Sequence, residues 1–210
     1  MQILKPNRDG DQTLCMQTPW ERALEFHGHV CPGLVIGFRA AERGLRELGI
    51  DGLNPDNLVV IAENQSCAVD AIQVVTGCTL GKGSLELRDY GKHVYSFVCR
   101  DTGEAVRVAL RFTALGFAAG LQELREDFLR EPSAENERIL TRRREAIADQ
   151  LMEMPEEELW EISSFHSELP SRPRVLPSLC CARCGEGVME SRARLAKGQV
   201  VCLPCLKRGV

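Results

Sequence analysis

Hydrophobic positions in the first quarter of the chain recur at helical spacing, and proline and glycine mark the ends of the segments. Thr18-Pro19-Trp20-Glu21 is a capping box with proline at the first helical position, which predicts a helix from Pro19 to about His27. Gly28 is a natural helix terminator. A second helix is predicted from Pro32 to about Leu48. It contains three glycines that would let another backbone approach closely: Gly33, Gly37 and Gly44.

In the middle of the chain, the helical spacing gives way to short runs of apolar residues, many of them β-branched. Residues 58–62 (Leu-Val-Val-Ile-Ala) are typical of a buried strand, and residues 68–76 then return to a helical pattern that breaks at Gly77. Three further apolar runs predict a β-meander whose last turn, at 101–103, is a hairpin. These runs cover residues 85–90, 94–98 and 105–112.

The next two segments are helical and polar. Helices are predicted from Leu115 to Leu129 and from Ser133 to Met154, with a short helical turn beginning at Pro155. The second is long and heavily charged, as in a surface helix or a dimer arm. Strands and helices without strict alternation indicate an α+β fold, with a mixed or antiparallel sheet, packed helices and long C-terminal helices.

Changes in amino-acid composition along the chain indicate separate domains. The sequence predicts an α+β domain over residues 1–169, a Pro-rich linker over 170–178 and a small zinc ribbon over 179–210. Formal net charge is -4, but residues 172–210 contain eight Lys/Arg and only two Asp/Glu. A basic tail on an acidic body indicates contact with nucleic acid or a docking face for that acidic body. The chain has no run long enough for a membrane span and no signal-like start, so we expect a cytoplasmic protein without a membrane partner.

Five of the ten cysteines lie in the last 31 residues. Cys181-x2-Cys184 is followed after seventeen residues by Cys202-x2-Cys205, which is typical of a four-cysteine zinc site. Four thiolates fill the coordination shell, so this zinc is expected to be structural. Cys180 is an alternative ligand, but the two-residue spacing favours Cys181.

A second set of ligand-type residues lies in the first half. His27, His29 and Cys31 stand at alternate positions, and Cys31 precedes a helix start, where the helix's positive end should favour the thiolate. Further candidates lie just before, within and after the helix at 68–76: Cys67, Asp70 and Cys78. Imidazole and thiolate together indicate zinc or iron. We predict a metal site formed by the histidines and cysteines, with Asp70 orienting an imidazole. The alternative is a nucleophilic Cys31 with a histidine base, which leaves Cys67 and Cys78 unexplained.

Three motifs in order carry a family resemblance. They are Phe26-His27-Gly28-His29-Val30-Cys31-Pro32-Gly33, then Cys67-Ala-Val-Asp70-Ala-Ile-Gln73, then Gly77-Cys78-Thr79-Leu-Gly81-Lys82-Gly83. Together they resemble the FmdE family of formylmethanofuran dehydrogenase subunits over about residues 20–154. The resemblance implies a dimerising α+β domain with a metal near the cysteine and histidine motifs. It also implies kinship with an accessory subunit of a molybdenum or tungsten oxidoreductase.

The leading functional prediction is therefore a homodimeric metal-binding protein that serves a partner oxidoreductase subunit or binds a small ligand in a redox or one-carbon context. Any dehydrogenase chemistry would lie in the partner. A second hypothesis is a metal- or redox-responsive regulator whose basic ribbon contacts nucleic acid or a protein. A third is an enzyme in its own right, with an open metal position; three strong protein ligands would support it.

Overall fold

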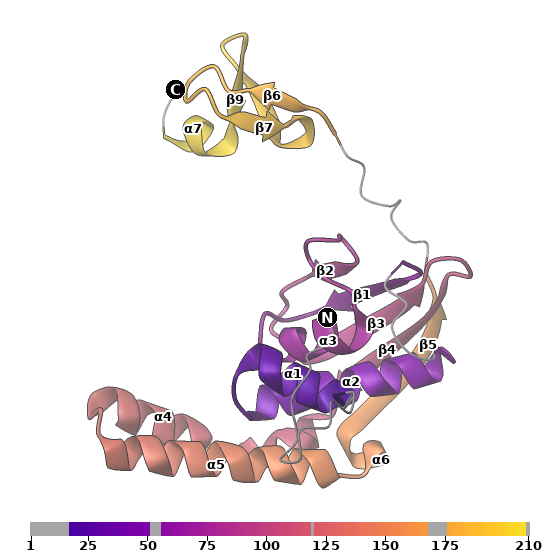
Figure 1. Cartoon of the computed structure of the whole chain (residues 1–210), viewed down its shortest axis with the longest axis vertical. Helices are drawn as coiled ribbons and strands as arrows, with labels where there is room; N and C mark the ends of the chain where they lie inside the picture. The colour runs from indigo at the N-terminus through magenta and orange to yellow at the C-terminus, as the bar shows by residue number, and fades with distance from the viewer. Residues whose placement is uncertain (1–16, 51–55, 119, 168–175, 209–210) are drawn as a thin grey trace, which may run out of the picture. The chain divides into compact units, whose positions relative to one another are not determined.

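The computed structural model describes residues 17–50, 56–118, 120–167 and 176–208 (Figure 1). The chain divides into two compact units, Met1–Leu169 and Pro170–Val210, which we describe separately. Cys15 and most of the predicted linker lie outside the described residues. No helix in the described ranges is both long and apolar enough to cross a membrane.

The first two helices begin as the sequence predicts. Helix α1 spans Pro19–His27; Thr18 and Glu21 form the capping box, and Gly28 follows with a φ of 93°. Helix α2 spans Pro32–Glu47, and Cys31 is its N-cap. The Cys31 sulfur accepts a hydrogen bond from the Leu34 N–H at 3.4 Å, so this cysteine stabilises the first turn of α2.

One five-stranded sheet forms the centre of the first unit. Its order is β2-β1-β3-β4-β5, and only the β1–β2 pair is parallel. The strands are β1 (Leu58–Ala62), β2 (Leu85–Leu87), β3 (Val94–Cys99), β4 (Glu104–Leu110) and β5 (Trp160–His166). The mixed α+β class is confirmed, but the predicted meander is wrong in part. Helix α3 (Ala68–Thr76) carries the chain from β1 across to β2, so β2 does not pair with β3.

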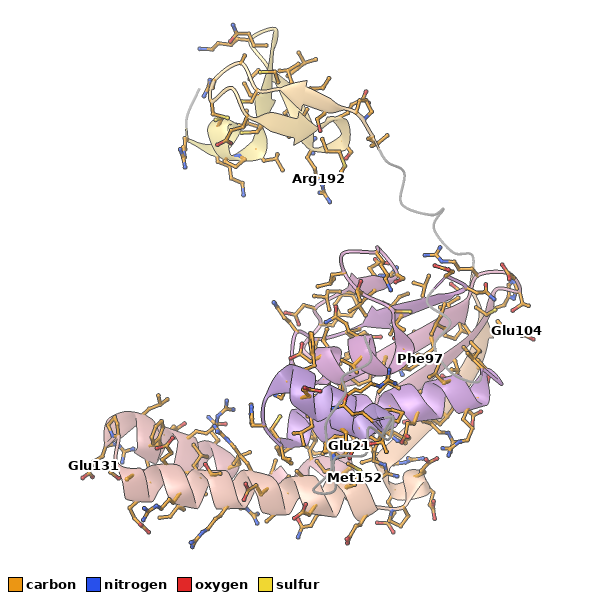
Figure 2. The ribbon with its side chains drawn as sticks, viewed as in Figure 1. Glu21, Phe97, Glu104, Glu131, Met152 and Arg192 are labelled. Carbon is orange, nitrogen blue, oxygen red and sulfur yellow. The ribbon has the colours of Figure 1, made fainter. Side chains whose placement is uncertain are left out.

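Helices α1, α2 and α3 pack together over one face of the sheet (Figure 1). Side chains such as Leu34, Ile72 and Phe97 fill the space between, and all three are fully buried. Figure 2 marks Phe97 between sheet and helices. The prediction of close backbone approach is confirmed at Gly37, where an added Cβ would lie 2.1 Å from the Ala68 carbonyl oxygen. At Gly44 the close neighbour is a side chain instead, because an added Cβ would lie 2.3 Å from the Phe97 ring.

The long helices form an antiparallel hairpin that extends from the sheet domain (Figure 1). Helix α4 spans Leu121–Arg130 and α5 spans Ala134–Glu153, followed by the short α6 (Glu156–Leu159). The predicted start of the first helix at Leu115 is wrong, because Phe112–Ala118 form a 3-10 helix (η1) and Gly120, with a φ of 78°, precedes α4. Strand β5 was not predicted from the sequence, although its alternating Trp160 and Ile162 were an available signal.

The second unit is a small ribbon of two hairpins. Strand β6 (Ser178–Cys180) pairs with β7 (Gly187–Met189), and β8 (Ala193–Ala196) pairs with β9 (Gln199–Cys202). A 3-10 turn, η2 (Glu190–Arg192), joins the hairpins, and α7 (Leu203–Lys207) packs against the second. Lys197 and Gly198 have φ values of 50° and 77°, as a type I′ turn requires.

Candidate functional site

Three potential metal ligands meet where three helices begin or end. His27 is the last residue of α1, Cys31 is the N-cap of α2 and Cys67 is the N-cap of α3. One donor atom from each lies within 4.8 Å of the others. A nitrogen and two sulfurs at this spacing can bind one ion of the zinc or iron type. The chain brings them together because α1, α2 and α3 pack on one another.

Asp70 fixes the orientation of His27. Its Oδ2 lies 2.8 Å from His27 Nδ1, and His27 Nε2 lies 3.4 Å from the Cys31 sulfur. An ionised carboxylate can only accept a hydrogen bond, so Nδ1 carries the proton and Nε2 presents its lone pair toward the thiols. A carboxylate on the outer nitrogen of a histidine is a common support for metal-binding imidazoles.

The pKa of the Cys31 thiol is raised, whereas the sequence predicted that the helix terminus would favour the thiolate. Burial raises the pKa of the Cys31 thiol to about 11, and nearby Cys67 adds to the rise, although the Leu34 N–H opposes it. Burial therefore outweighs the helix terminus, and the thiol is protonated at neutral pH. A buried thiol of this kind is a poor nucleophile, whereas a bound cation would favour loss of its proton. The metal interpretation thus agrees better with this environment than a Cys31–histidine nucleophile.

Two residues predicted for this site lie outside the three-atom cluster. His29 is exposed, and its ring lies against His27 with centroids 4.5 Å apart. Cys78 is fully buried beyond the far end of α3, where its thiol donates to the Leu58 carbonyl oxygen at 3.4 Å. Burial also raises the pKa of Cys78. Cys78 therefore belongs to the packing of α3 against β1.

Gly33 allows Cys67 to pack close to the first turn of α2. A Cβ added at Gly33 would stand 3.0 Å from the Cβ of Cys67, so a larger residue would push the cysteine away. The sequence marks Gly33 as a point of close backbone approach, but its spacing does not reveal that Cys67 is the neighbour.

A polar network that was not predicted from the sequence supports the loop before Cys67. Buried Asn64 accepts from the Ser66 hydroxyl at 2.8 Å and donates to the Lys92 carbonyl oxygen at 2.9 Å. Its amide nitrogen also lies 3.1 Å from His93 Nδ1. The run of polar residues between a buried strand and Cys67 was the available signal.

The ribbon contains the second cluster. The sulfurs of four cysteines lie within 4.8 Å of one another: Cys181, Cys184, Cys202 and Cys205. Backbone N–H groups of Cys184 and Cys202 lower the pKa of Cys181 to about 6, which favours the thiolate that metals bind. Exposed Cys180 is outside the cluster. Both clusters can bind a metal.

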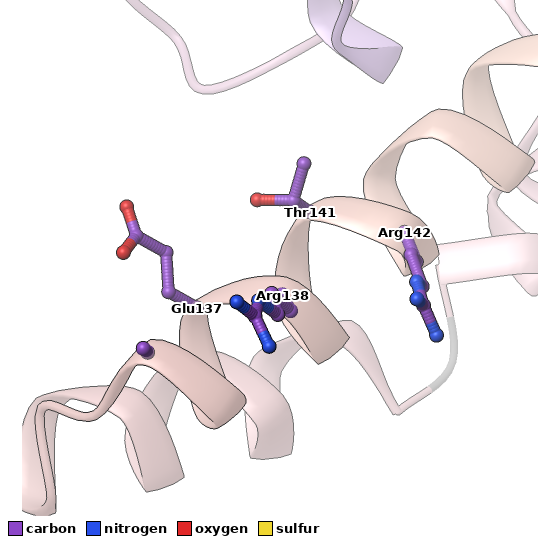
Figure 3. A pocket seen from close by; sticks show the side chains of 5 residues that line it. Glu137, Arg138, Thr141 and Arg142 are labelled. Atoms are coloured by element: carbon purple, nitrogen blue, oxygen red, sulfur yellow. The ribbon is translucent and has the colours of Figure 1, made fainter.

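The lining of a hollow of about 490 Å³ includes no residue of either cluster (Figure 3). Its lining residues all come from one helix, α5: Ala134, Glu137, Arg138, Thr141 and Arg142. It contains no cysteine or histidine, so it offers no soft metal ligand.

Most of the first unit matches a known protein family. A family model described as "FmdE, Molybdenum formylmethanofuran dehydrogenase operon" matches residues 26–161. The chain belongs to the FmdE family. The matched FmdE residues include the His27–Cys31–Cys67 cluster and Asp70, whereas the ribbon cysteines lie outside the match.

A solved structure and a curated protein extend this comparison. The crystal structure of a tungsten formylmethanofuran dehydrogenase FmdE-like protein from Syntrophus aciditrophicus is 26% identical, with a TM-score of 0.58 and 90% of each chain covered. A probable S-adenosyl-L-methionine-binding protein of Archaeoglobus fulgidus is 31% identical over 192 residues. That match covers 88% of this chain and 51% of the relative, so this FmdE chain spans about half of that protein's length.

Proposed function

We propose that this FmdE protein is a metal-binding accessory protein whose first unit binds zinc or iron through His27, Cys31 and Cys67. The observation that carries the proposal is the meeting of one nitrogen and two sulfurs within 4.8 Å, with Asp70 bonded to the outer nitrogen of His27. The raised pKa of Cys31 agrees with this proposal, because a bound cation would stabilise the thiolate that burial alone disfavours.

The number of ligands supports a ligand-binding role for this ion. Three protein ligands leave a tetrahedral metal with one position for a small molecule, as in sites of the two-cysteine, one-histidine type. The four ribbon thiols close the shell of a second, structural zinc. We therefore propose two ions per chain with different roles: one that meets a small ligand and one that stabilises the ribbon.

We further propose that the protein acts as a homodimer beside an oxidoreductase subunit that performs the redox chemistry. The family supports the oxidoreductase context. The α4–α5 hairpin supports the dimer, because α4 buries no residue completely and large apolar side chains stay exposed on the hairpin. Leu129 is 76% exposed and Ile139 is 41% exposed. Sedimentation analysis tests the dimer; a monomer at micromolar concentration would refute it.

Elemental analysis of protein purified without chelators tests the metal site. The wild type should contain two ions per chain, and Cys31→Ser or Cys67→Ser should each remove the first-site ion and leave the ribbon zinc. Cys99→Ser is a matched control, because Cys99 is a half-exposed thiol in β3 outside both clusters. Unchanged metal content in the two site variants would reject the proposal.

A further inference from the structure

Several basic side chains of the ribbon have no acidic partner within the described residues. They are exposed at the surface and form no ion pair or hydrogen bond there. We call them the basic patch: Arg192, Lys197, Lys207 and Arg208. Arg194 differs, because its guanidinium donates to the carbonyl oxygens of Ser191 and Ala193.

The patch lies on ordered elements that contact one another. Arg192 ends η2 directly before β8, and Figure 2 shows its side chain at the ribbon surface. Lys197 occupies the tight turn at the other end of β8, about 17 Å away at strand rise. Lys207 and Arg208 lie at the end of α7, which packs against both β8 and β9. These cations are therefore held by a folded ribbon rather than by a mobile tail.

The charge and the side-chain composition of the ribbon indicate which kind of partner it would bind. Duplex DNA presents one negative charge per roughly 1.7 Å of axis, so two cations about 17 Å apart span the distance of several phosphates. Residues 176–208 contain no aromatic side chain on which an unpaired base could stack. Helix α7 has five residues, too few to read a major groove. These features favour contact with the backbone alone.

We propose that the ribbon binds the phosphate backbone of double-stranded DNA through the basic patch, without base readout. Four phosphate contacts imply a salt slope of about -3.6, which is about 150-fold weaker binding at 200 mM than at 50 mM salt. This interaction is separate from the first metal site and does not depend on its ion.

Fluorescence anisotropy of a short mixed-sequence duplex with the full-length, metal-loaded protein tests the proposal. Neutralising three residues in Arg192→Gln/Lys197→Gln/Lys207→Gln should weaken binding and reduce the salt slope by about 3. A control with equal charge change is Lys92→Gln/Arg100→Gln/Arg125→Gln in the first unit, which should bind like wild type. Zinc content verifies that each ribbon is folded.

Four outcomes would overturn the proposal. Absence of binding at 50 mM salt would refute DNA binding by this protein. An equal loss of DNA affinity in both triple variants would show that the basic patch is not the DNA-binding surface. Tighter binding to single strands than to duplex would indicate base contacts. Competition by polyglutamate as effective as by duplex at equal charge would indicate an acidic protein partner, which the 77% exposed Leu195 beside the patch would then help to contact.

Discussion

Asp70 and His27 lie 43 residues apart in sequence, yet Asp70 Oδ2 and His27 Nδ1 are 2.8 Å apart. The bond joins the first turn of α3 to the last turn of α1 and directs His27 Nε2 toward Cys31. Asp70 thus supports a metal ligand without lying in the three-atom cluster itself.

Replacing this carboxylate should weaken metal binding without abolishing it. Asp70→Asn keeps the shape of the side chain but removes the charge that holds the His27 tautomer. We expect a loss of roughly 10–100-fold in affinity at the first site, on the order found for such supporting residues. Competition titration with a chromophoric chelator measures it. Asp149→Asn, at an exposed position on α5, should leave the affinity unchanged; equal affinity in Asp70→Asn would show that the carboxylate has no such role.

Gly37 should be intolerant of any side chain. Its missing Cβ would overlap the backbone oxygen of Ala68, which cannot rotate away as a side chain can. We expect Gly37→Ala to lower the free energy of unfolding by about 1–3 kcal/mol, measured by urea denaturation. Gly81→Ala is the control, because Gly81 has open space around it and no positive φ; it should be neutral or slightly stabilising. Equal stability of the two variants would contradict the close packing of α2 on α3.

Stability should fall in acid partly through Glu156. Burial alone would raise the pKa of this carboxyl, but ion pairs with Arg46 and Arg43 of α2 reverse the effect and lower it from its usual 4.5. The unfolded chain therefore binds the proton more tightly than the folded chain. The stabilisation is fully present above pH 4.5 and is lost as the pH falls through the folded pKa.

Glu156→Gln should flatten this part of the curve of stability against pH. Thermal melts at stepped pH through the acid range compare it with Glu158→Gln, an exposed neighbour on α6 without an ion pair in the described residues. A Glu156→Gln variant that loses stability in acid as steeply as Glu158→Gln would exclude this linkage.

Chelation should unfold the ribbon and spare the sheet domain. The ribbon's cluster of buried apolar residues consists of Cys181, Val201 and Cys202, which is too little to fold without a cation. In ¹H–¹⁵N spectra, a strong chelator should collapse the ribbon signals to random-coil positions while those of β1 and β3 remain dispersed. Persistent ribbon signals in metal-free protein would contradict a folding role for the ion.

The sequence predicted local structure better than long-range pairing. Caps and glycine stops are local, so α1, α2, α3 and α5 were placed within a residue or two. The pairing of β2 with β1 depends on where α3 takes the chain. The alternation in edge strand β5 stops after Ile162, because the residues on both faces of its second half are exposed. At the site, residue types were informative, but alternation could not separate His27 from His29. Nor could sequence show that α3 holds Cys78 apart from Cys67.

Cys31 performs two tasks with one atom. Its sulfur accepts the Leu34 N–H that starts α2, and the same sulfur faces His27 and Cys67. Serine at this position would still cap the helix but offers a weak ligand for soft metals, whereas alanine would remove both functions. The difference in unfolding free energy between Cys31→Ser and Cys31→Ala therefore isolates the capping contribution, and the difference between wild type and Cys31→Ser isolates what the ion adds to the fold.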